Sequence, residues 1–159
     1  MRTFLKRIGI TVIVALVLMQ LYRPARTNPE VEPGHSIEAL LDVDHAGFAV
    51  IRQACFDCHS NETDWPWYTN VAPVSWFVID HVDHAREHMN FSEWARLDAE
   101  GAEHKLEEIC EEVEEGEMPL ASYKLMHPEG RLTDEQTEEI CRWTAAVREA
   151  LTREDPGAF

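Results

Sequence analysis

The chain has 159 residues and a formal net charge of −16 at pH 7, and all 30 of its acidic residues lie after residue 29. This length suits one domain with a single core once the N-terminal segment is set aside. So acidic a surface repels nucleic acid and anionic lipid headgroups, which excludes a nucleic-acid-binding protein. It either favours encounters with basic partner surfaces or serves only solubility, for example in a saline habitat.

Residues 1–7 form a basic start, and the apolar segment 8–22 follows it without an acidic residue. This order is typical of an export signal or a signal-anchor. The segment ends in Tyr22-Arg23-Pro24 rather than in the small residues that a signal peptidase reads. We therefore expect an uncleaved transmembrane signal-anchor over 8–22 in a bacterial inner membrane, with residues 1–7 in the cytoplasm and the following domain in the periplasm. A cleaved signal is the alternative.

Residues 23–35 contain three prolines and no periodic apolar pattern, which predicts an extended and mobile tether. Over 36–159 no segment alternates with period two, and apolar residues recur at helical spacing. We therefore expect an all-α domain with long loops, including 60–73 and 118–130. The predicted helical features are short helices over 36–54, a helix over 74–89, an N-cap at Ser92, a helix with the apolar stripe 106–113 that Gly116 ends, and a last helix with a Thr133–Gln136 capping box.

The most informative motif is Cys55-Phe56-Asp57-Cys58-His59, because CxxCH is the pattern by which c-type haem is attached. Two thiols three residues apart can form thioethers with the two vinyl groups of one porphyrin, and the adjacent imidazole can bind the iron as proximal ligand. A thioredoxin-like dithiol and half of a zinc site are the competing interpretations. Both are weakened, because no second CxxC or CxxH pair follows and no alternation of strands and helices surrounds the motif.

A haem iron held by His59 needs a ligand on its other face, and Met118 is the candidate. It stands between Gly116 and Pro119, which favour an extended loop that presents a thioether. Three histidines share one face of the predicted helix 74–89, and they offer an alternative distal ligand, a separate metal site or only a polar stripe: His81, His84 and His88. His127, which precedes a proline, is a further alternative ligand or a donor to a propionate.

Several residues around the motif are candidate haem contacts, through ring stacking or through hydrogen bonds and an ion pair to the propionates: Trp65, Trp67, Tyr68, Trp76, Arg86 and Tyr123. Packing in the core, or a surface ion pair in the case of Arg86, is the plainer alternative. Asn61 is a candidate hydrogen-bond donor behind the ligands. Cys110 and Cys141 remain after the haem pair is assigned, and they form either a disulfide or two buried thiols.

Two resemblances follow from these residues. Met118-Pro119 with Leu132-Thr133-Asp134-Glu135 and Trp143 looks like the C-terminal half of small monohaem cytochromes c. More specifically, most of the chain resembles the haem-binding domain family of exported cytochrome-like proteins, through Cys58-His59-Ser60-Asn61, Trp65-Pro66-Trp67-Tyr68, Ala72-Pro73-Val74-Ser75-Trp76, Asn90-Phe91-Ser92-Glu93-Trp94, Gly116-Glu117-Met118-Pro119 and the segment Gln20 to Pro24. The resemblance implies one covalent haem c in a membrane-tethered periplasmic domain. Ala85 departs from it, because the family usually has glycine there.

The sequence thus predicts a cytochrome c-like domain over 36–159 that carries single electrons through one covalent haem with His59 and Met118 as axial ligands. We expect an electron carrier rather than an enzyme, because the sequence shows no nucleophile–base set, no phosphate-binding loop and no paired carboxylates in a cleft. The expected partners are a redox protein with a basic docking surface and the membrane. A five-coordinate or bis-His sensor or peroxidase-like protein, and a non-haem metal or thiol-redox module, are the alternatives.

Overall fold

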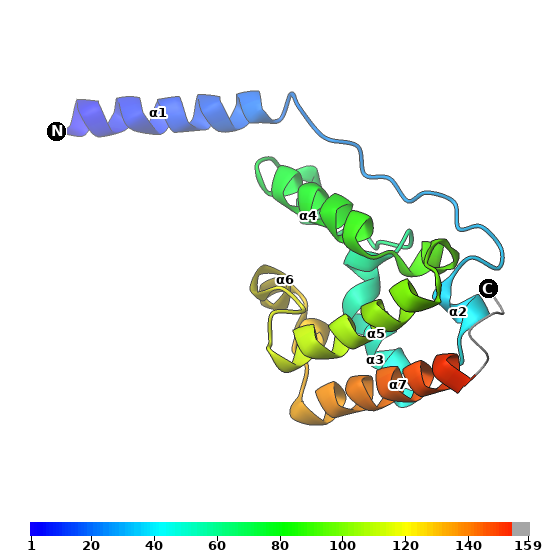
Figure 1. Ribbon diagram of the computed structural model, residues 1–159. Helices are drawn as coiled ribbons and strands as arrows, with labels where there is room; N and C mark the ends of the chain where they lie inside the picture. The colour runs from blue at the N-terminus through cyan, green and yellow to red at the C-terminus, as the bar shows by residue number, and fades with distance from the viewer. Residues whose placement is uncertain (154–159) are drawn as a thin grey trace.

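The computed structural model describes residues 1–153, and that range is helical without any β-strand, as the apolar periodicity predicts. In chain order the elements are α1 (Arg2–Met19), α2 (Ile37–Leu40), α3 (Ala46–His59), the 3-10 helix η1 (Trp67–Asn70), α4 (Val74–His88), η2 (Phe91–Arg96), α5 (Ala99–Glu114), α6 (Ala121–Met126), η3 (Pro128–Gly130) and α7 (Asp134–Arg153) (Figure 1).

The core lies where α7 packs against both α3 and α5. Each of these helices carries an apolar stripe at helical spacing, so that one face is buried while the other stays charged. The buried members of the stripes are Phe48 and Ile51 on α3, Leu106, Ile109 and Val113 on α5, and Ile140, Trp143 and Val147 on α7. These are the positions that the sequence pattern predicts to face inward.

Aromatic packing fixes the C-terminal half of α3. The ring of Phe56 stacks on that of Phe91, with 4.8 Å between ring centroids, and both side chains are buried. Phe48 contacts Trp143, whose indole N–H donates to the carbonyl of Asp42 at 2.9 Å. Because Phe56 lies between the two motif cysteines and points into the core, the cysteines on either side of it are turned toward another face of α3.

Gly47 allows the close approach of α3 to α7. A Cβ atom built on Gly47 would lie 2.1 Å from the backbone oxygen of Glu139 and 2.9 Å from the Cβ of Trp143. Neither neighbour can move aside alone, since one is helix backbone and the other belongs to a buried tryptophan. The glycine therefore sets the distance between the two helices.

Gly47→Ala is expected to lower the free energy of unfolding by about 3 kcal/mol, at the upper end of the cost of overpacking a core. Urea unfolding followed by circular dichroism measures this. Gly9→Ala is the matched control, because nothing lies within 4 Å of the added methyl group, and its effect is expected to stay within about 0.5 kcal/mol. Equal unfolding midpoints for the two variants would contradict the close packing.

The helix ends agree with the sequence in two places and differ in two. The capping box is present, because the backbone N–H of Gln136 donates to Thr133 Oγ1 and that of Thr133 donates to Gln136 Oε1. Gly116, at φ +75°, ends α5 as predicted. Ser92 is not an N-cap. It lies inside η2, and Asp98 caps α5 by accepting the N–H of Gly101 at 2.8 Å. The segment 118–130, expected to be a loop, contains α6 and η3.

Cys110 and Cys141 form a disulfide that joins α5 to α7, with 4.8 Å between their Cα atoms. Of the two interpretations that the sequence left open, the structure has the bridged form. It crosslinks two helices that already pack together, and thereby fixes the α5 wall described below relative to the core.

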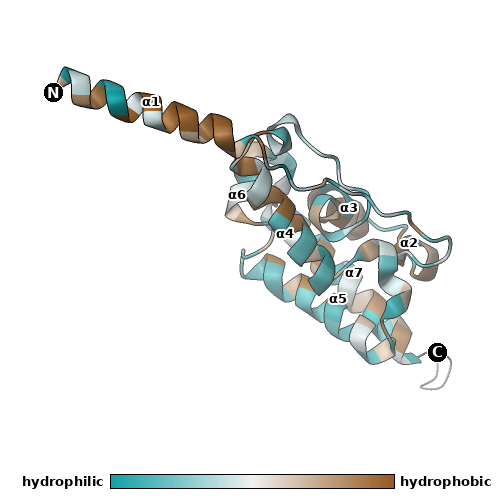
Figure 2. Cartoon of the chain, turned by 90° about the horizontal axis from the view of Figure 1, so that it is seen from above, coloured by the Kyte–Doolittle hydropathy of each residue, from teal (hydrophilic) through white to brown (hydrophobic). Residues whose placement is uncertain are grey.

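The N-terminal helix α1 corrects one expectation. It extends from the helical body and buries none of its residues, and its apolar part follows a polar, basic start (Figure 2). Within residues 1–153 no helix has both the length and the hydropathy that a membrane crossing requires. The reason is visible in α1, whose 18 residues include Arg2, Lys6 and Arg7. The predicted transmembrane signal-anchor, and the inner-membrane location that depended on it, are therefore wrong.

Candidate functional site

A cavity of about 520 Å³ opens between α3, α4, α5 and α6. Its walls bring together four side chains that the sequence singles out from segments about sixty residues apart: Cys55, Cys58, His59 and Met118. The rest of the wall has an apolar part with Ala54, Phe91, Ile109, Val113 and Leu120, and a charged part on α4 and α5 with Asp80, Lys105, Glu108 and Glu112. Apolar walls with a few convergent polar groups are typical of a site for a large flat cofactor.

The cavity face of α3 carries the motif. Cys55 and Cys58 are three residues apart, so both thiols lie on the same side of the helix, opposite the buried Phe56. His59 is the last residue of α3, and extended backbone follows at Ser60. The two sulfurs are not bonded to each other. Both thiols and the imidazole are thus available to one ligand.

His59 is held in the orientation that a metal ligand needs. Its Nδ1 lies 3.2 Å from the carbonyl oxygen of Met89, which accepts the ring proton and fixes the tautomer with its proton on Nδ1. Burial lowers the pKa of His59, although the hydrogen bond to Met89 works in the opposite direction. The neutral ring, which is the form that binds metals, is therefore favoured.

The motif thiols are protonated at neutral pH. Burial raises the pKa of Cys55 to about 12, with a smaller contribution from Cys58, and it raises the pKa of Cys58 to about 11, with a smaller contribution from Asp57. A catalytic dithiol needs at least one cysteine with a lowered pKa. The thiol-redox interpretation of this CxxC is therefore disfavoured.

Met118 reaches the cavity from the loop after α5. The backbone turns at Gly116, and the N–H of Met118 then donates to the carbonyl of Glu112 at 3.0 Å. Pro119, which also lines the cavity, is buried. The hydrogen bond and the buried proline hold Met118 at the wall between α5 and α6.

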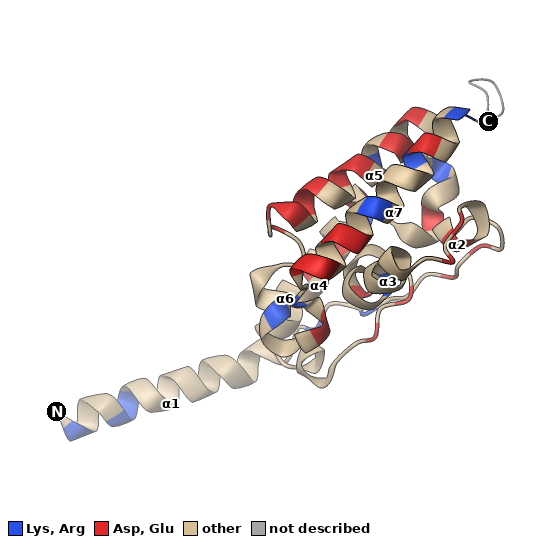
Figure 3. Ribbon diagram, turned by 90° about the horizontal axis from the view of Figure 1, so that it is seen from below, with Lys and Arg blue, Asp and Glu red and all other residues tan. Residues whose placement is uncertain are grey.

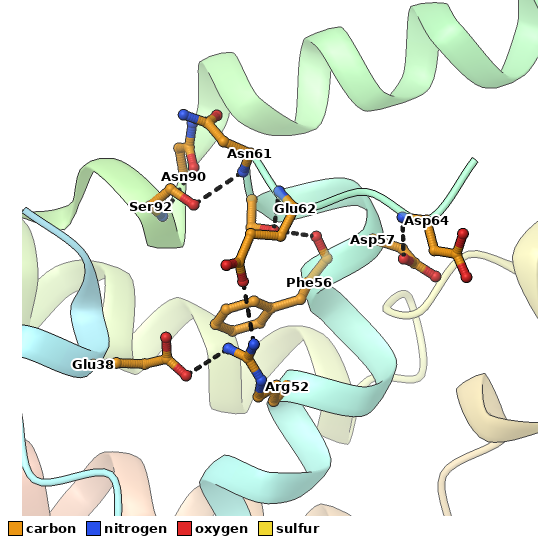
Figure 4. A network of polar contacts seen from close by, with 10 residues as sticks. Glu38, Arg52, Phe56, Asp57, Asn61, Glu62, Asp64, Asn90 and Ser92 are labelled. Atoms are coloured by element: carbon orange, nitrogen blue, oxygen red, sulfur yellow. Dashed lines mark hydrogen bonds and ion pairs between the residues drawn. The ribbon is translucent and has the colours of Figure 1, made fainter. Parts of the chain in front are cut away.

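The loop after the motif is braced by a polar network (Figure 4). The hydroxyl of Ser60 donates to the carbonyl of Phe56 at 2.7 Å, and the hydroxyl of Ser92 accepts the N–H of Asn61 at 3.0 Å. Asn90 Nδ2 donates to Asn61 Oδ1 at 2.8 Å. Asn61 thus holds the chain that leaves His59 against the segment that carries Met89, with its side-chain oxygen as an acceptor rather than as the donor that the sequence suggests.

Five of the six predicted haem contacts do not line the cavity. Trp65, Trp76 and Arg86 instead bind the N-terminal segment 20–28. The indole N–H of Trp76 donates to the carbonyl of Tyr22 at 2.9 Å, that of Trp65 donates to Asn28 Oδ1 at 3.0 Å, and Arg86 Nη1 donates to the carbonyl of Thr27 at 2.8 Å. Trp67 is 73% exposed. The segment 23–35, expected to be a mobile tether, is thus hydrogen-bonded to the domain at Arg26, Thr27 and Asn28, and it occupies donors that were assigned to the propionates.

Tyr123 is the one predicted aromatic contact on the cavity wall. Its hydroxyl donates to Asp57 Oδ2 at 2.9 Å, and burial together with this carboxylate raises the pKa of Tyr123. Its ring stacks on His127, whose Nε2 is 2.6 Å from the hydroxyl of Tyr68 and whose Nδ1 is 2.8 Å from Glu129. Tyr68 and His127 therefore lie behind the wall, and both ring nitrogens of His127 already have partners.

The histidines of α4 do line the cavity. The Nδ1 atoms of His81 and His84 are within 2.8 Å of the carbonyls of Phe77 and Asp80, one turn earlier, so that the hydrogen bonds of both rings are made through Nδ1. His88 instead lies 2.9 Å from Glu108 on α5. Within residues 1–153, ligand atoms of His, Cys, Asp and Glu side chains converge only at Cys110, Glu114 and Cys141, where the two sulfurs are already bridged. A separate metal site on the histidine stripe is therefore not supported.

The sequence interpretation missed the wall that α5 contributes. Lys105, Glu108, Ile109 and Glu112 share one face of α5 and line the cavity. This face could have been found from the sequence, because these residues recur at intervals of three and four residues, as those of the apolar stripe do. Burial alone would raise the pKa of Glu108, but the contacts with Lys105 and His88 lower it.

The comparisons with known proteins agree with this site. Residues 14–146 match the family model described as haem-binding domain, which covers most of the chain and every residue of the motif. Neither a curated protein nor a solved structure gives a significant match. The fit of the site is independent of that comparison, since two thiols, a neutral imidazole and a thioether on one apolar cavity are the donor set of a haem c. The chain belongs to the haem-binding domain family.

Proposed function

We propose that the protein is a c-type cytochrome that carries single electrons through one covalently attached haem. The observation that supports this most strongly is the convergence of Cys55, Cys58, His59 and Met118 on a single cavity. The bound haem supplies an iron that exchanges one electron reversibly. The protein supplies the attachment, the two axial ligands and the apolar surroundings.

The attachment is assigned to the two motif thiols. Each S–H would add across one vinyl group of the haem, the sulfur forming a thioether and the hydrogen going to the neighbouring carbon, so that no atom would be lost. Both thiols face the cavity and neither forms a disulfide, which leaves them free for this addition. The protonated state of the two thiols also fits this addition, because both the sulfur and the hydrogen of each S–H would become part of the product.

The axial ligands are assigned to His59 and Met118. The carbonyl of Met89 orients His59, as supporting groups orient histidine ligands in metal sites. Ligation by methionine and an apolar wall both favour the ferrous state, so that the reduction potential should exceed that of a bis-His site. A filled coordination sphere leaves no position for peroxide or a gas, which favours a carrier over a sensor or peroxidase.

A bis-His protein is the second candidate, because His81 and His84 line the same cavity as Met118 and the hydrogen bonds of both rings are made through Nδ1. His127 is a poorer alternative, since it does not line the cavity and both of its nitrogens have partners. The two candidates differ in the ligand that opposes His59, and a spectrum distinguishes them.

The partner that fits is a redox protein with a basic docking surface. The outer face of α5 and the turn after it are strongly acidic (Figure 3), with exposed glutamates at 111, 114, 115 and 117. These charges lie on the helix that forms one wall of the cavity. Attraction to a basic surface would therefore bring the partner close to the haem, and the rate of association should fall as salt is added.

The test is a redox titration of the protein produced together with haem-attachment machinery. We expect one reversible one-electron transition, a low-spin spectrum in both oxidation states, and no binding of carbon monoxide to the ferrous protein. A high-spin ferrous spectrum with rapid binding of carbon monoxide would contradict the carrier and support a sensor or peroxidase-like protein.

A further inference from the structure

Lys105 occupies a distinctive position on the cavity wall. Among residues 1–153, it is the one lysine or arginine that lines the cavity, although the chain has 14 such residues. Its side chain is only 16% exposed. A lysine is rarely so far withdrawn from water unless it has a partner for its charge.

The partners that Lys105 has are incomplete. Its Nζ lies 2.7 Å from Glu108 Oε2 and 3.2 Å from His88 Nε2. The same His88 Nε2 lies 2.9 Å from Glu108 Oε1, so this nitrogen either donates to Glu108 or accepts from Lys105, but does not do both. An ammonium group has three N–H donors. At least one donor of Lys105 therefore remains for a further acceptor at the cavity.

A haem brings such an acceptor. Its two propionates are carboxylates. The cavity wall formed by α4 and α5 already contains the acids Asp80, Glu108 and Glu112, so a propionate placed there needs a positive partner. The other wall donors are poorly suited, because the hydroxyl of Tyr123 is given to Asp57, and His81 and His84 gain a free donor only when they are protonated. The residues that the sequence suggested for the propionates, Arg86 above all, are bonded to the N-terminal segment.

We propose that Lys105, braced by Glu108 and His88, binds a haem propionate at the wall between α4 and α5. This inference rests on the proposed haem c. A charge-assisted hydrogen bond from Lys105 would neutralise one propionate in an otherwise acidic setting and fix the orientation of the haem in the cavity. A positive charge on the cavity wall would also favour the ferrous state.

The test compares Lys105→Met with Arg148→Met in the haem-loaded full chain. Arg148 is the matched control, because it also pairs with glutamates of α5, at 3.0 Å from Glu103 and from Glu107, but does not line the cavity. Two quantities are measured: the reduction potential and the propionate bending band in the resonance Raman spectrum. Lys105→Met is expected to lower the potential and to shift the band. Arg148→Met is expected to leave the band in place and to change the reduction potential much less. Lys105→Arg, which keeps the positive charge, is expected to have the band position and the reduction potential of the wild-type chain.

The outcomes separate this inference from the function on which it rests. Equal potentials and unshifted bands in haem-loaded Lys105→Met and Arg148→Met would overturn the propionate contact alone, as would a lower potential without a band shift. A wild-type chain that takes up no covalent haem would overturn the proposed function first. If the Lys105→Met chain takes up no haem, Lys105→Gln is measured in its place. The glutamine amide keeps a hydrogen-bond donor but removes the charge, so this variant is also expected to lower the reduction potential.

Discussion

Met118→Ala is expected to abolish the weak ferric absorption band at the red end of the spectrum that reports an iron–sulfur bond. The thioether lies on the wall of the cavity that also holds His59, and alanine cannot reach the iron in its place. The loss should be complete, and the reduction potential should fall by a measurable part of the roughly 0.8 V that axial ligands span. The variant should also bind carbon monoxide when it is reduced, unless His81 or His84 takes the open position.

Met126→Ala is the matched control for this prediction. Met126 is on α6, 56% exposed and away from the cavity wall, so its variant should keep both the band and the potential. A red band that survives in Met118→Ala would show that another side chain opposes His59. The covalent haem would still stand in that case, and the histidines of α4 would become the ligand candidates.

Replacing Cys55 and Cys58 together by serine is expected to remove all covalently bound haem. Serine cannot form a thioether, and these are the two thiols that line the cavity. The variant should release its porphyrin into acid acetone, whereas the wild-type chain should keep it. Acid-acetone extraction followed by absorption of the protein pellet measures the difference.

The other cysteine pair provides the control. Cys110→Ser with Cys141→Ser breaks the disulfide between α5 and α7 and should cost about 3 kcal/mol of stability. It should nevertheless keep the covalent haem, because neither sulfur is needed for attachment. Loss of haem from this variant at a temperature where it is folded would contradict the division of the four cysteines into an attachment pair and a structural pair.

Cys55, Cys58, His59 and Met118 could be singled out as site candidates from the sequence because each depends on local chemistry, and the structure brings them to one cavity. The spacing of Cys55 and Cys58 places both thiols on one side of a helix whatever the rest of the fold does. Met118 was predictable from Gly116 and Pro119, which constrain its own loop. The stripes of α5 and α7 likewise follow from periodicity, and the capping box at Thr133 from four adjacent residues.

The surroundings of the site were not predictable in this way, because they depend on which distant segments compete for the same donors. Arg86, Trp65 and Trp76 carry groups suited to propionates, but the extended segment 20–28 presents backbone carbonyls and an amide to them. Nothing in the local sequence reveals that competition. Lys105 was overlooked because a lysine within a glutamate-rich helix looks like an ordinary surface residue. Only the fold shows that its side chain is mostly withdrawn from solvent and lines the cavity.

The N-terminal segment shows a different limit. A basic start followed by an apolar run predicts a signal-anchor by pattern alone. The structure instead shows α1 as an 18-residue helix whose first third is cationic, and within residues 1–153 no helix meets the requirements for crossing a membrane. The signal-anchor pattern describes the order of basic and apolar residues, whereas a membrane crossing requires a sufficient length of helix without charges.

The intact mass of the denatured wild-type chain, produced together with haem-attachment machinery, tests the central claim most directly. The two thiols add to the vinyl groups without loss of atoms, so the account predicts the mass of the polypeptide plus that of one whole haem. Digestion should place the added mass on the peptide that contains Cys55 and Cys58. A mass equal to that of the bare polypeptide would contradict the assignment of this protein as a c-type cytochrome.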